Sequence, residues 1–104
     1  MPDAKPNLYQ RLQAEFPDTI AAVERLGDAS HRAGPLDALT VQLVQLAGAA
    51  AIRSEGAVHS HTRRALAAGA TPQQIRHALL ALTSTIGFPT VTASLSWVDD
   101  VLEP

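Results

Sequence analysis

The sequence predicts a single all-α domain of five or six helices over residues 1–104. Aromatic residues make up only 4% of the chain and hydrophobic residues 46%, so the core must be built from Ala, Leu, Val and Ile. Such small side chains favour close packing between helices. Apolar residues also recur at helical spacing in several segments, and Gly and Pro separate those segments.

The first two expected helices meet at Pro17. Apolar residues recur at fourfold spacing within residues 7–16, which predicts a short helix there. Because proline breaks or restarts a helix, a second helix is expected over residues 17–34, where Gly34 is placed to end it.

The third expected helix, residues 36–52, is the most apolar segment of the chain. Its apolar residues form a wide stripe at helical spacing, which Val44 widens further. A helix that is apolar over most of its circumference is buried on several sides. In a small protein this predicts burial against other subunits.

Residues typical of a helix end and of a helix start separate the next two helices. The stretch SEGAVHSHTRRALAAGAT predicts a helix that ends near Gly69. Thr71 is then a helix N-cap, followed by Pro72 at the first helical position and by Gln74, which completes a capping box. The helix that begins here has an inner face of Ile75, Leu79, Leu82 and Ile86.

The final segment, residues 90–104, follows a Gly-Phe-Pro turn at residues 87–89. Its VTASLSW stretch alternates apolar and polar residues, as a strand would. Apolar residues at helical spacing fit a helix equally well. Because one isolated strand would have no partner, the segment is predicted to be helical.

The totals exclude several classes of function. The net charge is −2 and no basic cluster stands out, so no nucleic-acid partner is expected. There is no cysteine, which excludes disulfides, thiolate metal sites and thiol redox chemistry by this chain alone. No apolar segment is long enough to span a bilayer, and the polar N-terminus lacks a secretory signal. A cytoplasmic protein without a membrane partner is expected.

His59 and His61 raise the question of a metal site. Residues two apart point about 200° apart on a helix, so the His-Ser-His triplet is a poor chelate and no metal is expected. One helix face carries Glu55, His59 and Thr62. The expected arrangement on that face is a solvated ion pair between Glu55 and His59.

His61 lies on the opposite face, among small apolar residues with Ser54 at their start. A histidine on an apolar face is either a satisfied core residue or, where it lines a cavity, a general acid or base. A nucleophilic Ser54–His61 pair is not expected, since two helical turns put these residues about 10 Å apart.

Three segments together resemble the carboxymuconolactone decarboxylase family, which also includes the alkylhydroperoxidase D-like proteins. They are LTVQLVQLAGAAAI, HTRRALAAGATPQQIRHALLAL and GFPTVTASLSWVDDVL, within residues 34–102. The resemblance implies an orthogonal-type helical bundle of the alkylhydroperoxidase D-like kind that assembles into homo-trimers or homo-hexamers.

The redox branch of that family uses a Cys-x-x-Cys pair before a helix histidine. When that histidine is aligned on His61, the cysteine positions fall on Ser54 and Ala57, so dithiol peroxidase activity is excluded. The glutamate of the preceding helix corresponds most nearly to Gln42, which cannot carry a proton.

The chain therefore looks more like the decarboxylase branch, which acts on 4-carboxymuconolactone without a cofactor. The resemblance implies a small carboxylated lactone as substrate, His61 as the catalytic acid and an arginine as carboxylate anchor. The arginine could be Arg53, Arg63 or Arg64, of which Arg64 lies nearest to the His61 face. Ser54 and Gln42 are the other substrate-binding candidates.

The alternative hypothesis is a non-catalytic, oligomeric helical protein that binds a small ligand or a partner through the same pocket. The surroundings of His61 distinguish the two. A cavity with an arginine within reach favours the enzyme, and apolar packing with both ring nitrogens satisfied by backbone contradicts it.

Overall fold

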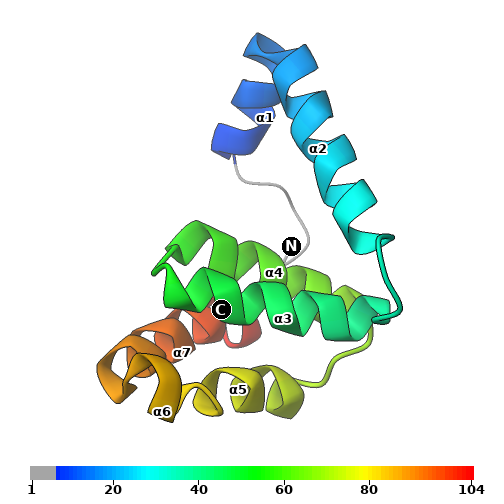
Figure 1. Ribbon diagram of the computed structural model, residues 1–104. Coiled ribbons are helices and arrows are strands. Elements are labelled where there is room, and N and C mark those ends of the chain that lie inside the picture. The colour runs from blue at the N-terminus through cyan, green and yellow to red at the C-terminus, as the bar shows by residue number, and fades with distance from the viewer. Residues whose placement is uncertain (1–6) are drawn as a thin grey trace. The chain divides into compact units, whose positions relative to one another are not determined.

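The computed structural model describes residues 7–104, which contain seven helices and no strand. The predicted all-α fold class is thereby confirmed (Figure 1). The chain divides into two compact units, Met1–Leu36 and Asp37–Pro104, described separately below, and the single-domain organisation stays a prediction. The helices are α1 (Asn7–Glu15), α2 (Pro17–His31), α3 (Ala38–Ala51), α4 (Glu55–Ala67), α5 (Pro72–Leu80), α6 (Thr83–Ile86) and α7 (Phe88–Leu102).

The N-terminal unit is a helical hairpin. Pro17 occupies the start of α2, as expected, because its missing N–H and fixed φ suit the first helical turn. Helix α2 ends at His31, one turn before the expected end at Gly34. None of the residues 7–36 is buried, and Leu26 keeps 67% of its surface exposed. Within the described residues this unit therefore has no hydrophobic core.

The C-terminal unit contains the core. Helix α3 packs against α4, α5 and α7, while α7 packs against α4, α5 and α6 as well (Figure 1). The core residues are apolar and mostly small, as the composition predicted. They are Leu46, Ala49, Ala50, Val58, Ala65, Ala70, Ile75, Leu79 and Val98.

A tight link joins α3 to α4. The N–H of Arg53 donates to the carbonyl of Ala50 at 3.0 Å, and the N–H of Ser54 donates to the carbonyl of Ala49 at 3.0 Å. These two bonds define a Schellman motif, which requires a left-handed residue. Arg53 takes that conformation with φ 57°, although glycine is the usual residue. Because the link is so short, α3 and α4 run antiparallel, side by side.

The same motif ends α4, here with a glycine. Gly69 has φ 99°, its N–H donates to Leu66, and the N–H of Ala70 donates to Ala65 at 2.9 Å. The predicted capping box follows and is confirmed. Thr71 accepts the N–H of Gln74 at 3.1 Å, and the side chain of Gln74 accepts the N–H of Thr71 at 2.9 Å.

The helix expected from Pro72 to Ile86 is interrupted. Helix α5 ends at Leu80 and the short α6 begins at Thr83. The hydroxyl of Thr83 donates to the carbonyl of Leu80 at 2.7 Å, which gives that carbonyl a partner outside the regular helical ladder. The predicted inner face is confirmed for Ile75 and Leu79, which are fully buried.

The final segment is helical, as predicted, rather than a strand. Gly87 precedes α7 with φ 91°, a conformation that only glycine adopts readily. The polar residues that suggested alternation are accommodated in the helix. The hydroxyl of Ser94, for example, donates to the carbonyl of Thr90 at 3.0 Å. Across residues 7–104, each helix is too short or too polar to cross a bilayer.

Candidate active site

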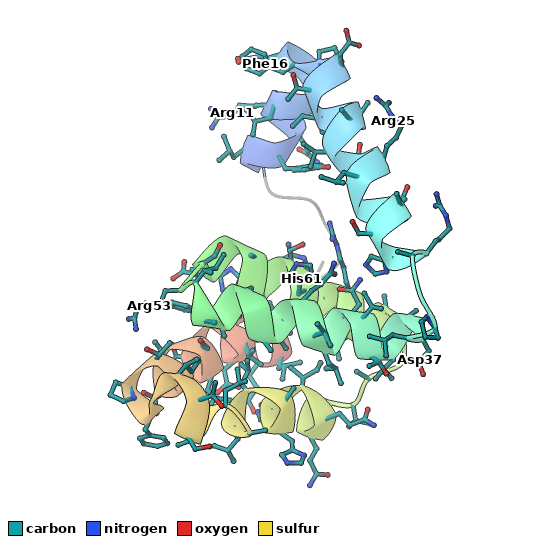
Figure 2. The ribbon with its side chains drawn as sticks, in the orientation of Figure 1. Arg11, Phe16, Arg25, Asp37, Arg53 and His61 are labelled. Carbon is teal, nitrogen blue, oxygen red and sulfur yellow. The ribbon has the colours of Figure 1, made fainter. Side chains whose placement is uncertain are left out.

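His61 and Gln42 meet across the packed faces of α3 and α4. Nδ1 of His61 lies 3.0 Å from Oε1 of Gln42. Gln42 is buried, with 6% of its surface exposed, and His61 is partly buried. Figure 2 shows His61 on α4 beside α3. Of the predicted site residues, these two are brought together by the structure.

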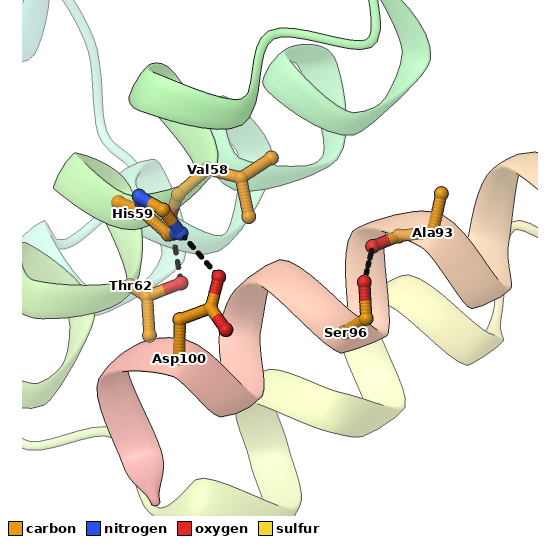
Figure 3. A network of polar contacts seen from close by, with 6 residues as sticks. All are labelled: Val58, His59, Thr62, Ala93, Ser96 and Asp100. Atoms are coloured by element: carbon orange, nitrogen blue, oxygen red, sulfur yellow. Dashed lines mark hydrogen bonds and ion pairs between the residues drawn. The ribbon is translucent and has the colours of Figure 1, made fainter. Parts of the chain in front are cut away.

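His59 lies on the other face of α4 and contacts a different helix. Its Nε2 is 2.9 Å from Oδ2 of Asp100 in α7 (Figure 3). The predicted ion pair between His59 and Glu55 is therefore wrong. Helix α7 covers this face of α4, so a carboxylate from a distant part of the chain reaches His59. The separation of the two histidines onto opposite faces is confirmed.

Thr62 was expected on the solvated face beside His59, and this prediction is wrong. The residue is fully buried, and its hydroxyl donates to the carbonyl of Val58 at 2.7 Å (Figure 3). Packing of α7 against α4 buries it. The hydroxyl needs an internal partner there, because an unpaired buried polar group costs about 1–3 kcal/mol.

Ser54 caps α4 at its N-terminus. Its hydroxyl accepts the N–H of Ala57 at a long 3.4 Å, which satisfies one of the free donors of the first helical turn. No hydrogen bond to His61 is observed for this hydroxyl. The side chain lies about two turns from His61 along the helix, as the sequence predicted.

Arg53 is fixed at the end of α3. Nη1 of its guanidinium donates to Oγ1 of Thr90 in α7 at 2.8 Å. Its backbone is left-handed, an arrangement that costs about 1–2 kcal/mol for a residue with a Cβ. Figure 2 shows Arg53 at the end of α3 opposite Asp37, which caps the start of that helix. The guanidinium is exposed and retains donors for a further contact.

Arg64 lies in the last turn of α4 and is exposed. A cation there complements the partial negative charge of the helix C-terminus, so it has a structural role whatever else it binds. It is one helical turn from His61, as the spacing predicted. Arg53 thus precedes His61 along the chain and Arg64 follows it on α4, and neither takes part in the His61–Gln42 hydrogen bond.

The arrangement around His61 suits proton transfer more than metal binding. A histidine side chain can give and take a proton near neutral pH, and a hydrogen bond to one ring nitrogen orients the ring. Among residues 7–104, no group of three or more histidine, aspartate or glutamate side chains gathers in a way that could hold a metal ion. The Nδ1 partner of His61 is a side-chain amide, so this nitrogen is not satisfied by the backbone.

Sequence reasoning missed two partners of the predicted residues. The hydroxyl of Thr90 contacts Arg53, and the carboxylate of Asp100 contacts His59. Thr90 and Asp100 both lie on α7. No local pattern identifies these contacts, because each joins residues far apart in the chain. The left-handed conformation of Arg53 was not predicted either, because a Schellman motif is usually recognised in a sequence by its glycine.

The comparison with known proteins settles the family. The model of the carboxymuconolactone decarboxylase family matches residues 17–100. The chain therefore belongs to the carboxymuconolactone decarboxylase family, and the match extends the observed resemblance back to the start of α2. No curated protein matches the chain, and no solved structure matches it either.

Proposed function

We propose that the protein is a cofactor-free decarboxylase of a small carboxylated lactone, with His61 as its catalytic acid. The observation that carries the proposal is the His61–Gln42 contact of 3.0 Å in a chain of this family. The sequence has no cysteine, so dithiol peroxidase chemistry is closed to the chain.

The reaction requires a place for one electron pair and a source of one proton. The bond to the carboxylate carbon breaks, carbon dioxide leaves, and its electron pair moves into the unsaturated carbonyl system of the lactone. His61 then donates a proton to the resulting carbanion and recovers it from solvent. A cation stabilises the negative charge that develops on the carbonyl oxygen.

The arginines are the candidates for that cation. Arg64 lies one turn from His61, and Arg53 lies beyond the N-terminus of the same helix. A guanidinium binds a carboxylate through two parallel hydrogen bonds, which fixes orientation as well as charge. Arg53 is already oriented by Thr90. Ser54 and Gln42 supply neutral polar atoms for the substrate.

We further propose that the active form is a homo-oligomer, a trimer or a hexamer. The support is the exposed apolar surface among residues 7–104. Residues 7–36 bury no side chain, and Val44 on α3 keeps 56% of its surface exposed. A segment below about 40 residues is rarely stable without further contacts. Light scattering on the purified protein tests this, and a stable monomer at micromolar concentration would contradict it.

The test of activity is release of carbon dioxide from 4-carboxymuconolactone, with His61→Ala and the control His59→Ala. General acid catalysis contributes about 10²–10⁴-fold, so His61→Ala should lose that factor. His59→Ala should stay within about threefold of wild type, because His59 contacts α7 on the other face. Background rates for wild type would sink the assignment.

A second function is favoured by one observation. Gln42, which contacts His61, is an amide that cannot hold a proton, so it cannot serve as a second acid or base beside the ring. A non-catalytic protein of this fold would bind a small carboxylated ligand, or a partner, at the same residues. Calorimetry with the lactone, combined with no turnover, would support this alternative.

A further inference from the structure

Gln42 is the one buried polar residue of α3, and its side chain is aimed at His61. Its amide oxygen lies 3.0 Å from Nδ1 of the ring. Every buried side-chain nitrogen and oxygen among residues 7–104 has a hydrogen-bond partner. Burial at 6% exposure restricts the amide, so the contact fixes the ring as well.

We propose that Gln42 is a positioning residue that holds His61 in the tautomer with its proton on Nδ1. An amide oxygen accepts hydrogen bonds and cannot donate them, so Nδ1 must carry the hydrogen of this contact. The neutral ring then has its lone pair on Nε2. Proton exchange with a substrate runs through Nε2, a nitrogen that the sequence did not distinguish from Nδ1.

The contact persists through the whole proton cycle. In the imidazolium both ring nitrogens are protonated, and in the neutral ring Nδ1 keeps its hydrogen. The Nδ1–H group therefore donates to Gln42 in both states, and the ring does not have to turn when Nε2 gains or loses its proton. Ring orientation set through the second nitrogen is a general way to fix a histidine tautomer.

The partner is also neutral, and this sets the balance between the two states. Helix α3, Ala38–Ala51, contains no ionisable side chain at all. A carboxylate at the position of Gln42 would favour the imidazolium and hold the proton on the ring. The amide orients the ring without that charge, so it leaves the proton easier to release.

Other charged groups of the unit Asp37–Pro104 lie on α4 itself and on α5 and α7, which pack against it. On α4 itself they are Glu55, His59, Arg63 and Arg64. The carboxylate of Asp100 on α7 is engaged by His59 on the opposite face of α4. Arg76 of α5 pairs with Asp99 of α7 at 3.0 Å and with Glu103, the residue that follows α7, at 3.6 Å.

The first experiment is nitrogen-15 NMR of the full chain labelled at histidine, recorded above the pH at which its rings titrate. His61→Asn assigns the His61 signals, and the exposed His77 serves as the internal reference. The expected result is a protonated Nδ1 and a bare Nε2 at His61. A protonated Nε2 with a bare Nδ1 would mean that Gln42 donates, and would overturn the proposal.

The second experiment compares Gln42→Glu, which keeps the shape and adds a charge, with Gln42→Leu, which removes the acceptor. Gln42→Glu should retain the Nδ1–H tautomer and raise the midpoint of the His61 titration by about one pH unit or more. Gln42→Leu should lose the tautomer preference. The control Gln73→Glu adds the same charge at an exposed position of α5 and should leave the midpoint unchanged.

An unchanged midpoint in folded Gln42→Glu would contradict the proposal, and the spectrum of the wild type decides the tautomer even if a variant fails to fold. The catalytic part rests on the proposed function, but the tautomer does not. If the protein has the Nδ1–H tautomer but does not decarboxylate the lactone, the proposed function is contradicted and the positioning role of Gln42 is not. If the protein decarboxylates the lactone but has the Nε2–H tautomer, the positioning role of Gln42 is contradicted and the proposed function is not.

Discussion

The two histidines of α4 make similar contacts in opposite surroundings. His59 lies 2.9 Å from the carboxylate of Asp100, whose side chain is 59% exposed. His61 lies 3.0 Å from the amide of Gln42, which is 6% exposed. The first contact joins a histidine to an exposed carboxylate, and the second joins a histidine to a buried amide at a helix interface. The difference teaches that burial and partner charge, not distance, separate a surface contact from one that can orient a catalytic group.

The strongest way to break the comparison is to loosen the interface beneath His61. Leu46→Ala removes a fully buried side chain one turn from Gln42 on α3. The expected cost is about 2–5 kcal/mol in the free energy of unfolding, because a cavity is left in a packed core. Urea denaturation measures it. Gln73→Ala is the control at an exposed position of α5, with a change of at most about 0.5 kcal/mol.

The contacts themselves can then be compared by removing one partner from each. His61→Ala leaves the buried amide of Gln42 without this partner and should cost about 1–3 kcal/mol. His59→Ala removes one partner of a pair with an exposed carboxylate and should cost only about 0.2–1 kcal/mol. Equal costs, measured by urea unfolding under the same conditions, would remove the distinction between the two faces.

A third comparison concerns the two turns that end α3 and α4. Gly69→Ala places a Cβ at φ 99° and should cost about 1 kcal/mol. Arg53→Gly relieves the left-handed arginine at φ 57° but loses its bond to Thr90, so the net gain should be below about 1 kcal/mol.

Thermal unfolding of both variants and of Thr90→Val separates these contributions. Thr90→Val removes the side-chain bond without relieving the backbone, so it should destabilise slightly. A destabilised Arg53→Gly would show that the guanidinium contributes more than the backbone strain costs.

The smallest effect concerns Asp37, which caps the start of α3 and so helps to hold the Gln42 side of the interface. The backbone N–H of Thr40 donates to its carboxylate at 2.8 Å, which lowers the pKa of Asp37 below its ordinary 3.8. With the folded-state pKa below the unfolded one, the cap stabilises the fold above about pH 4 and loses this effect as pH falls through the folded-state pKa.

Asp37→Asn keeps a capping side chain without the ionisation. Its unfolding midpoint should depend less on pH than that of wild type in the range below about pH 4. Urea unfolding at several pH values in this range makes the comparison. Parallel pH profiles for the two proteins would show that the charge of Asp37 contributes nothing to the stability of α3.

Local sequence determined most of the helices. Pro17, the Thr71–Gln74 capping box and the glycines at 69 and 87 act through their own backbone geometry or through side chains three residues away. Such signals need no tertiary context, so the boundaries they mark were predicted. The break between α5 and α6 was missed because Thr83 competes for a carbonyl only once the chain has turned there.

The candidate site divides along the same line. Helical periodicity by itself separated His59 from His61 and placed Arg64 one turn from His61, since 3.6 residues per turn is a local property. Only the tertiary structure paired His61 with Gln42, His59 with Asp100 and Arg53 with Thr90. Those pairings depend on which helices pack together, at which angle and in which register. Such packing joins residues far apart in the sequence, and the hydrophobic effect that drives it is non-directional.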